Sequence, residues 1–133
     1  MTEANINRLN TTALAYLGDA VYEVRIRELI VDRFPRDAGR AHHAAVRYVS
    51  AEGQSAAARQ MMTEGFLTAD EEALLKRARN HRTMSRPQHA SARDYKLATG
   101  FEALLGYLHL AGESGRIDEI VAETIRIIDG QTL

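Results

Sequence analysis

Two acidic residues stand in apolar, helix-forming surroundings, where a charge is costly. Asp19 follows Gly18 directly in the run ALAYLGDAVYE, and Glu102 lies much further along the chain in the run TGFEALLGY. A carboxylate among leucine and valine side chains is destabilising unless a cation or a hydrogen-bond donor compensates for the lost hydration. We therefore expect both carboxylates to be buried by their apolar neighbours and to share one metal ion.

The type of these ligands indicates which metal they would hold. Hard divalent cations take oxygen ligands, and Mg²⁺ in particular keeps several waters while it binds one or two carboxylates and substrate phosphate oxygens. Such a site suits phosphodiester hydrolysis, in which the metal activates water and stabilises developing charge. For one acid alone, a surface charge or an ion pair with arginine is the simpler interpretation. The pair favours a catalytic Mg²⁺ site formed by Asp19 and Glu102.

A basic segment is the second candidate site. The run KRARNHR at residues 76–82 is followed by Arg86, Arg93 and Lys96. Its simpler interpretation is a solvated helix end, because positive charge is favoured at a helix C-terminus. The formal net charge of the whole chain is −1, so a surface that binds a polyanion has to be local. The residues that we predict to bind a polyanion are Arg77, Arg79, Asn80, Arg82 and Arg86.

Several other chemistries are excluded or disfavoured by composition and spacing. The chain has no cysteine, so it has no disulfide, thiolate zinc site or cysteine nucleophile. His42 and His43 are adjacent, point about 100° apart on a helix, and lack the acid of a histidine–aspartate hydrolase. His109 is more typical of an ordinary helix residue than of a ligand. Since no apolar run approaches the roughly 20 residues of a membrane span, we expect a soluble, cytoplasmic protein.

The elements that must position these residues are helices. The length of 133 residues is typical of one domain, and the apolar spacing predicts an all-α fold without strands. The predicted helices begin at Asn10 to Thr12, at Asp37, at Ser50, at the capping box from Thr68, at Ser91 to Asp94, and after the break from Gly112 to Gly115. Residues 83–92 contain Pro87 and predict an exposed, mobile loop.

Two features of the helices have further consequences. The first helix ends at Phe34-Pro35 and carries apolar residues around most of its circumference. We expect it to be partly buried all round, and since one small chain cannot cover it on every side, we expect a partner chain to cover the rest. Gly18 and Gly106 each lie inside a predicted helix, at a cost of roughly 1 kcal/mol against alanine. Glycines at such positions are typical of helices that cross at close distance.

The two acidic runs resemble two motifs of the ribonuclease III family. The run LGDAV at residues 17–21 resembles the signature helix of that family, and FEALLG at residues 101–106 resembles its second metal-binding helix. The resemblance covers nearly the whole chain and is strongest to the compact bacterial form, which lacks the double-stranded RNA-binding domain. It implies an all-helical endonuclease domain over residues 1–133, with Asp19 as the essential aspartate and Glu102 as the essential glutamate.

The resemblance also implies an activity and partners. We expect a homodimer around the signature helix and Mg²⁺-dependent hydrolysis of double-stranded RNA that leaves a 5′-phosphate and a 3′-hydroxyl, with the basic segment as the RNA contact. The compact form implies maturation of large-subunit (23S) ribosomal RNA precursors, with a large-subunit ribosomal protein as a further partner that shapes the substrate. Larger family members carry acids where this chain has Thr12, Ala15 and Thr99, so the number of metal ions stays open.

Two other functions remain as alternatives. A catalytically inactive helical RNA-binding or ribosome-associated module would share the fold, but such a module has no need of Asp19 and Glu102. A metal-dependent nucleotide hydrolase would need a glutamate-rich helix with paired acids at metal-ligand spacing, and the chain has none. A metal-dependent cleavage assay on a defined RNA duplex distinguishes these functions.

Overall fold

The computed structural model describes residues 1–81 and 91–131, and every regular element in these two ranges is an α-helix. The elements are α1 (Glu3–Asn7), α2 (Thr11–Arg33), α3 (Ala38–Val49), α4 (Ala51–Glu64), α5 (Ala69–Arg79), α6 (Ala92–Leu110) and α7 (Ser114–Asp129). The predicted all-α fold is confirmed. Most of the predicted loop, residues 83–90, lies outside the described residues, and α6 already begins at the last residue assigned to that loop.

The helix starts agree with the capping residues seen in the sequence. Asn10 Oδ1 accepts a hydrogen bond from the Ala13 N–H at 2.8 Å and so caps α2. Thr68 and Glu71 form the predicted capping box at the start of α5. Asp37, Ser50 and Ser91 cap α3, α4 and α6 through their side chains in the same way. Each cap satisfies an N–H that has no partner inside the helix, which explains why these boundaries were predictable.

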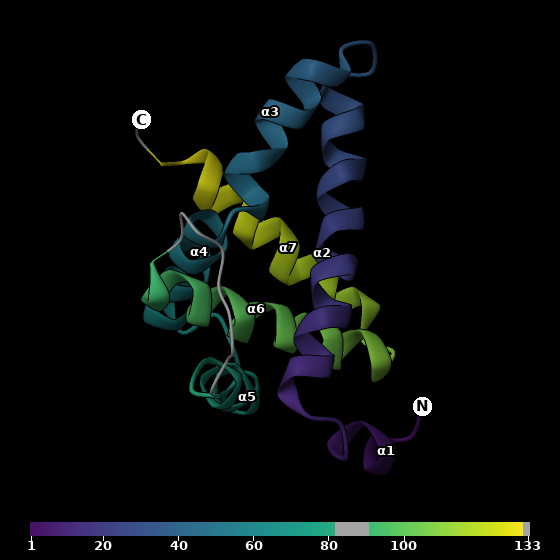
Figure 1. Cartoon of the computed structure of the whole chain (residues 1–133), viewed down its shortest axis with the longest axis vertical. Coiled ribbons are helices and arrows are strands. Elements are labelled where there is room, and N and C mark those ends of the chain that lie inside the picture. Colours follow the sequence, from purple (N-terminus) through teal and green to yellow (C-terminus); the bar gives the residue numbers. More distant parts are fainter. Residues whose placement is uncertain (82–90, 132–133) are drawn as a thin grey trace.

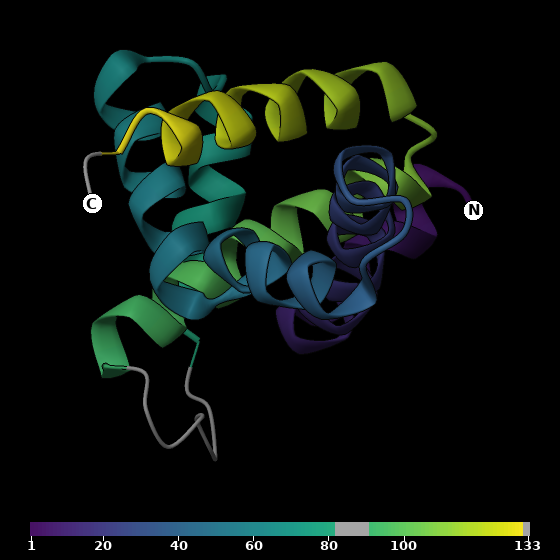
Figure 2. The ribbon, with the colours of Figure 1, turned by 90° about the horizontal axis from the view of Figure 1, so that it is seen from above.

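Helix α6 is the central element of the fold. It packs against α2, α4, α5 and α7, and its contact with α2 is the most extensive of the molecule. In Figure 1 the long α2 stands upright and α6 runs across it. Figure 2 shows α7 on one side of this crossing and α3 on the other. Phe101 of α6 is fully buried and meets Tyr22 of α2 edge to face, with ring centroids 5.2 Å apart. The core therefore surrounds the helix that carries Glu102.

The crossing of α2 and α6 depends on two glycines. A Cβ atom added to Gly18 would lie 1.6 Å from the backbone oxygen of Glu102, and one added to Gly106 would lie 2.0 Å from that of Leu14. Both distances are far below any van der Waals contact, so the two backbones touch where only glycine fits. The predicted close crossing is confirmed, and it fixes the backbone of Glu102 directly against α2.

Two features of the N-terminal part add to the sequence interpretation. The short helix α1 was not predicted, because its five residues bury only Ile6 and give no helical periodicity. Within the single chain, α2 leaves its outer face open, with Tyr16 85% exposed, Val24 55% exposed and Val31 62% exposed. Its buried residues form one stripe, which faces α6. No helix in the described ranges combines the length and the apolar character that crossing a membrane requires.

Candidate active site

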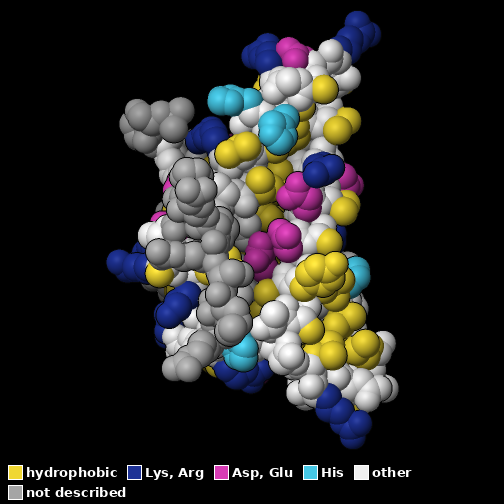
Figure 3. Space-filling view, in the orientation of Figure 1, with side chains coloured by type: hydrophobic (Ala, Val, Ile, Leu, Met, Phe, Trp, Pro, Cys, Tyr) yellow, Lys and Arg dark blue, Asp and Glu magenta, His cyan; other side chains and the backbone are white. Residues whose placement is uncertain are grey.

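The glycine crossing brings the two predicted acids together. Asp19 follows Gly18 on α2, and the backbone oxygen of Glu102 on α6 lies against Gly18 itself. The Asp19 carboxylate lies near enough to Glu102 to raise the pKa of that residue. Two carboxylates from distant parts of the sequence thus lie close together. In the view of Figure 3, acidic side chains gather near the centre of the visible face of the molecule, and most of the visible Lys and Arg side chains lie toward its edges.

The environments of the two acids differ. Glu102 is half-buried, in agreement with the expectation, but Asp19 is exposed, which contradicts it. The reason is helix geometry, because the buried stripe of α2 runs through Gly18 and Tyr22 and each further residue turns about 100° away from that stripe. The apolar neighbours of Asp19 in sequence are therefore not its neighbours in space. One carboxylate of the pair is held by the core, and the other is open to solvent and to a substrate.

The surroundings of Glu102 raise the pKa of its carboxyl group. Burial is the largest cause, followed by the negative charge of Asp19, and together they raise the pKa of Glu102 to about 8. A hydrogen bond from Gln54 acts in the opposite direction, and Glu23 adds a smaller negative charge. Two close carboxylates without a cation cannot both ionise freely, so Glu102 keeps a proton near neutral pH. A divalent cation between them would remove this repulsion.

Gln54 is a site residue that the sequence interpretation missed. It lies on α4, is only 2% exposed, and donates from Nε2 to Glu102 Oε2 at 3.3 Å and to the Val49 carbonyl at 2.9 Å. A signal for it exists in the sequence. Gln54 shares the buried face of α4 with Ala57, Ala58 and Met61, and a glutamine at that spacing is a polar residue on an apolar face.

The other candidate ligands contribute little to this site. Thr99 Oγ1 donates to the Tyr95 carbonyl, Thr12 is exposed, and Ala15 is buried and has no donor atom. His109 is exposed at the end of α6. In the ranges that the structure covers, three or more His, Cys, Asp or Glu side chains nowhere gather closely enough to hold a metal ion. Asp19 and Glu102 therefore remain the candidate ligands among the described residues.

The basic segment begins at the end of α5, close to α6. A Cβ atom added to Gly100 of α6 would lie 2.5 Å from the Leu75 backbone oxygen, so α5 touches α6 two residues before Glu102. Arg77 and Asn80 are exposed, while Arg79 is half-buried and donates from Nε to Asn80 Oδ1 at 3.1 Å. Of the five predicted contacts these three are described, and two lie outside the described residues, namely Arg82 and Arg86.

Sequence comparison finds known proteins that match most of the chain. A sequence model of the ribonuclease III domain matches residues 12–113 of the chain. The chain is 38% identical over 125 residues to Mini-ribonuclease 3 of Enterococcus faecalis, with 94% of each protein covered. It is also 38% identical over 129 residues to Mini-ribonuclease 3 of Symbiobacterium thermophilum, with 97% of this chain and 98% of the relative covered.

A solved structure gives the same result at the level of the fold. The X-ray structure of protein FN1578 from Fusobacterium nucleatum superposes with a TM-score of 0.79 at 27% identity, covering 92% of this chain and 96% of that one. The residues that match the family model, 12–113, include both acidic motifs and the glycines of the α2–α6 crossing. The chain belongs to the ribonuclease III family and is an endoribonuclease of that type.

Proposed function

We propose that Asp19 and Glu102 bind Mg²⁺ and that this site hydrolyses double-stranded RNA, within one catalytic domain over residues 1–133. The observation that carries the proposal is the meeting of the two carboxylates at the Gly18–Gly106 crossing. The donor set fits the ion, because both groups are carboxylates, and burial followed by the charge of Asp19 raises the pKa of Glu102. An uncompensated negative pair of this kind is stabilised by a divalent cation.

The two acids differ in what they do for the reaction. Glu102 is fixed by the core and by its hydrogen bond from Gln54, so it sets the position of the site. Asp19 is exposed and lies where a phosphodiester can approach. Mg²⁺ held by these two residues would supply Lewis-acid chemistry, activating water and stabilising the charge of the leaving oxygen. Hydrolysis of the bond to the 3′-oxygen leaves a 5′-phosphate and a 3′-hydroxyl.

The RNA is held by phosphate contacts from the end of α5. Arg77, Arg79 and Asn80 lie on the helix that packs against α6 beside Glu102, and we assign Arg82 and Arg86 to the same surface from the sequence. Double-stranded RNA is recognised through its shape, phosphates and 2′-hydroxyls more than through base edges. Basic side chains on a helix that packs against α6 suit such a substrate.

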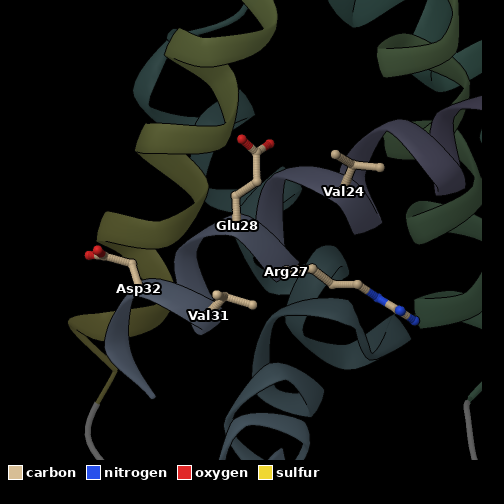
Figure 4. A pocket seen from close by; sticks show the side chains of 5 residues that line it. All are labelled: Val24, Arg27, Glu28, Val31 and Asp32. Carbon is tan, nitrogen blue, oxygen red and sulfur yellow. The ribbon is translucent and has the colours of Figure 1, made fainter. Parts of the chain in front are cut away.

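A second copy of this chain is the partner that best fits the outer face of α2. A shallow groove on this helix is lined by Val24, Arg27, Glu28, Val31 and Asp32 (Figure 4). Apolar side chains flanked by charges of both signs suit a two-fold interface, in which one patch meets its own copy. The same face carries the exposed ring of Tyr16. A homodimer around α2 would place two cleavage sites on one assembly, one for each strand of a duplex.

The physiological role follows from the similarity to the compact members of the family. We propose maturation of 23S ribosomal RNA precursors, and hence ribosome biogenesis, in the cytoplasm, with a large-subunit ribosomal protein that shapes the substrate. The 38% identity to proteins named Mini-ribonuclease 3, over nearly all of both chains, supports this assignment.

A cleavage assay tests the proposed activity. A 5′-labelled RNA duplex is incubated with the protein in Mg²⁺ or in EDTA, and with the variants Asp19→Asn and Glu102→Gln. We expect cleavage only with the wild-type protein and Mg²⁺, and unchanged helical content in both variants. Cleavage by either variant at the wild-type rate would refute the assignment of the site. Duplex binding without cleavage by the wild-type protein would instead identify an inactive RNA-binding module.

A further inference from the structure

Gln54 is the buried side chain whose chemistry the fold does not explain. Within residues 1–81 and 91–131, its Oε1 is the one buried side-chain oxygen or nitrogen atom without a hydrogen-bond partner. The residue shares its helix face with Ala57, Ala58 and Met61, so its surroundings on α4 are apolar. A buried polar atom without a partner destabilises the folded state. Leucine or methionine would fill the same space without that cost.

The orientation of the Gln54 amide is determined by its neighbours. Nε2 faces two acceptors, the Val49 carbonyl at 2.9 Å and Glu102 Oε2 at 3.3 Å. Rotating the amide by half a turn would place its oxygen against both acceptors and would leave the NH₂ group without either. The amide nitrogen therefore points to Glu102, and the unpaired Oε1 is a consequence of that choice.

Part of this arrangement is structural. Val49 is the last residue of α3, so its carbonyl has no partner within that helix, and one N–H of Gln54 satisfies it. This bond anchors the amide at the junction of α3 and α4. The second N–H of Gln54 does not cap a helix. It donates to the Glu102 carboxylate across the interface between α4 and α6.

We propose that Gln54 is a positioning residue for the metal ligand Glu102. Its amide, anchored on Val49, holds Glu102 Oε2 and so restricts the rotation of the carboxylate. The inference rests on the proposed Mg²⁺ site, which it deepens by assigning a residue that does not touch the ion. Partners that hydrogen-bond to a ligating carboxylate orient it, and their loss weakens metal binding or activity by about 10- to 100-fold.

The same pair of helices offers a matched control. Ser55 follows Gln54, is fully buried, and donates from Oγ to Asp94 Oδ1 of α6 at 2.8 Å. Ser55→Ala therefore also removes a hydrogen bond from α4 to a carboxylate of α6, but at an acid that is not in the proposed site. A purely structural role of Gln54 predicts the same behaviour for both substitutions.

The experiment measures Mn²⁺ binding to the full chain by calorimetry without RNA, and the Mg²⁺ concentration that gives half-maximal duplex cleavage. For Gln54→Met, which keeps the length of the side chain, we expect Mn²⁺ affinity about 10- to 100-fold weaker and a matching rise in the Mg²⁺ requirement. Duplex affinity in EDTA should stay unchanged, and excess Mg²⁺ should restore much of kcat. For Ser55→Ala we expect a lower Tm with wild-type Mn²⁺ affinity.

The outcomes separate this inference from the proposed function. Wild-type Mn²⁺ affinity in Gln54→Met, with Asp19→Asn and Glu102→Gln both deficient, overturns the role of Gln54 and leaves the metal site intact. Wild-type Mn²⁺ affinity in all three variants overturns the metal site itself. Gln54→Leu serves as a second variant if Gln54→Met does not fold, and loss of folding in both identifies Gln54 as a structural residue and overturns the inference.

Discussion

The substitution Glu102→Gln should stabilise the metal-free protein, and increasingly so as the pH rises. The folded state raises the pKa of Glu102 to about 8 from an ordinary value of 4.5, mainly through burial and then through the charge of Asp19. The folded state therefore holds a proton that the unfolded chain releases between these two values. The free energy of unfolding of the wild-type protein decreases as the pH rises through that window, and the loss is complete above the folded pKa. Glutamine does not ionise, so the variant avoids this loss.

The size of the effect follows from the shift. A pKa change of one unit corresponds to about 1.4 kcal/mol, so the full shift would be worth roughly 4–5 kcal/mol. Glu102 is only half-buried and its titration is coupled to Asp19, and both facts reduce the value that unfolding experiments measure. We expect Glu102→Gln to be more stable than the wild-type protein by about 2 kcal/mol at pH 9, and by much less at pH 5.

The assay is urea unfolding in EDTA, followed by circular dichroism at pH 5, 7 and 9. Asp19→Asn is the matched variant, because it removes the neighbouring charge but keeps the burial of Glu102, and it should show part of the same gain. Adding Mg²⁺ should stabilise the wild-type protein and not Glu102→Gln. A stability difference between wild type and Glu102→Gln that does not change with pH would refute the reasoning, as would a variant less stable than wild type at pH 9.

Three further predictions concern the crossing, the outer face of α2 and the basic segment. Gly18→Ala should lower the free energy of unfolding by roughly 2 kcal/mol and abolish cleavage, because its Cβ would force α2 and α6 apart. The control is Gly115→Ala, which has open space around it and should be neutral or slightly stabilising. Thermal unfolding measures both variants. Val24→Asp should turn a sedimenting dimer into a monomer, and a stable wild-type monomer at micromolar concentration would contradict the proposed interface. The double variant of Arg77→Glu and Arg79→Glu should weaken duplex binding and reduce its salt slope by roughly one unit per lost phosphate contact, without changing Mn²⁺ affinity.

Local features of the fold were predictable from the sequence. Capping side chains bond to N–H groups three residues away, so Asn10 and the Thr68 capping box mark helix starts without any tertiary information. Gly18 and Gly106 indicated a close helix crossing, because a glycine inside a helix lowers its stability and a close contact between helices compensates for that loss. The pairing of Asp19 with Glu102 was expected because two carboxylates on apolar helices favour one shared cation, and the family motifs pointed to the same pair.

The remaining features depend on tertiary structure. The exposure of Asp19 could not be inferred from its apolar sequence neighbours, because exposure depends on which side of α2 faces α6. Gln54 reaches Glu102 only through the packing of α4 on α6, although a glutamine on an apolar helix face was a visible signal. Helix α1 is too short to show a period and is held by the burial of Ile6.

The most direct test of the central claim is the position of a bound metal ion. Crystals grown with Mn²⁺ and measured at its absorption edge should show an anomalous difference peak between the carboxylates of Asp19 and Glu102, and crystals of Glu102→Gln should lack that peak. Mn²⁺ reports on this site because it takes the same oxygen ligands as Mg²⁺. A peak elsewhere on the molecule, or a peak that persists unchanged in Glu102→Gln, would contradict the account.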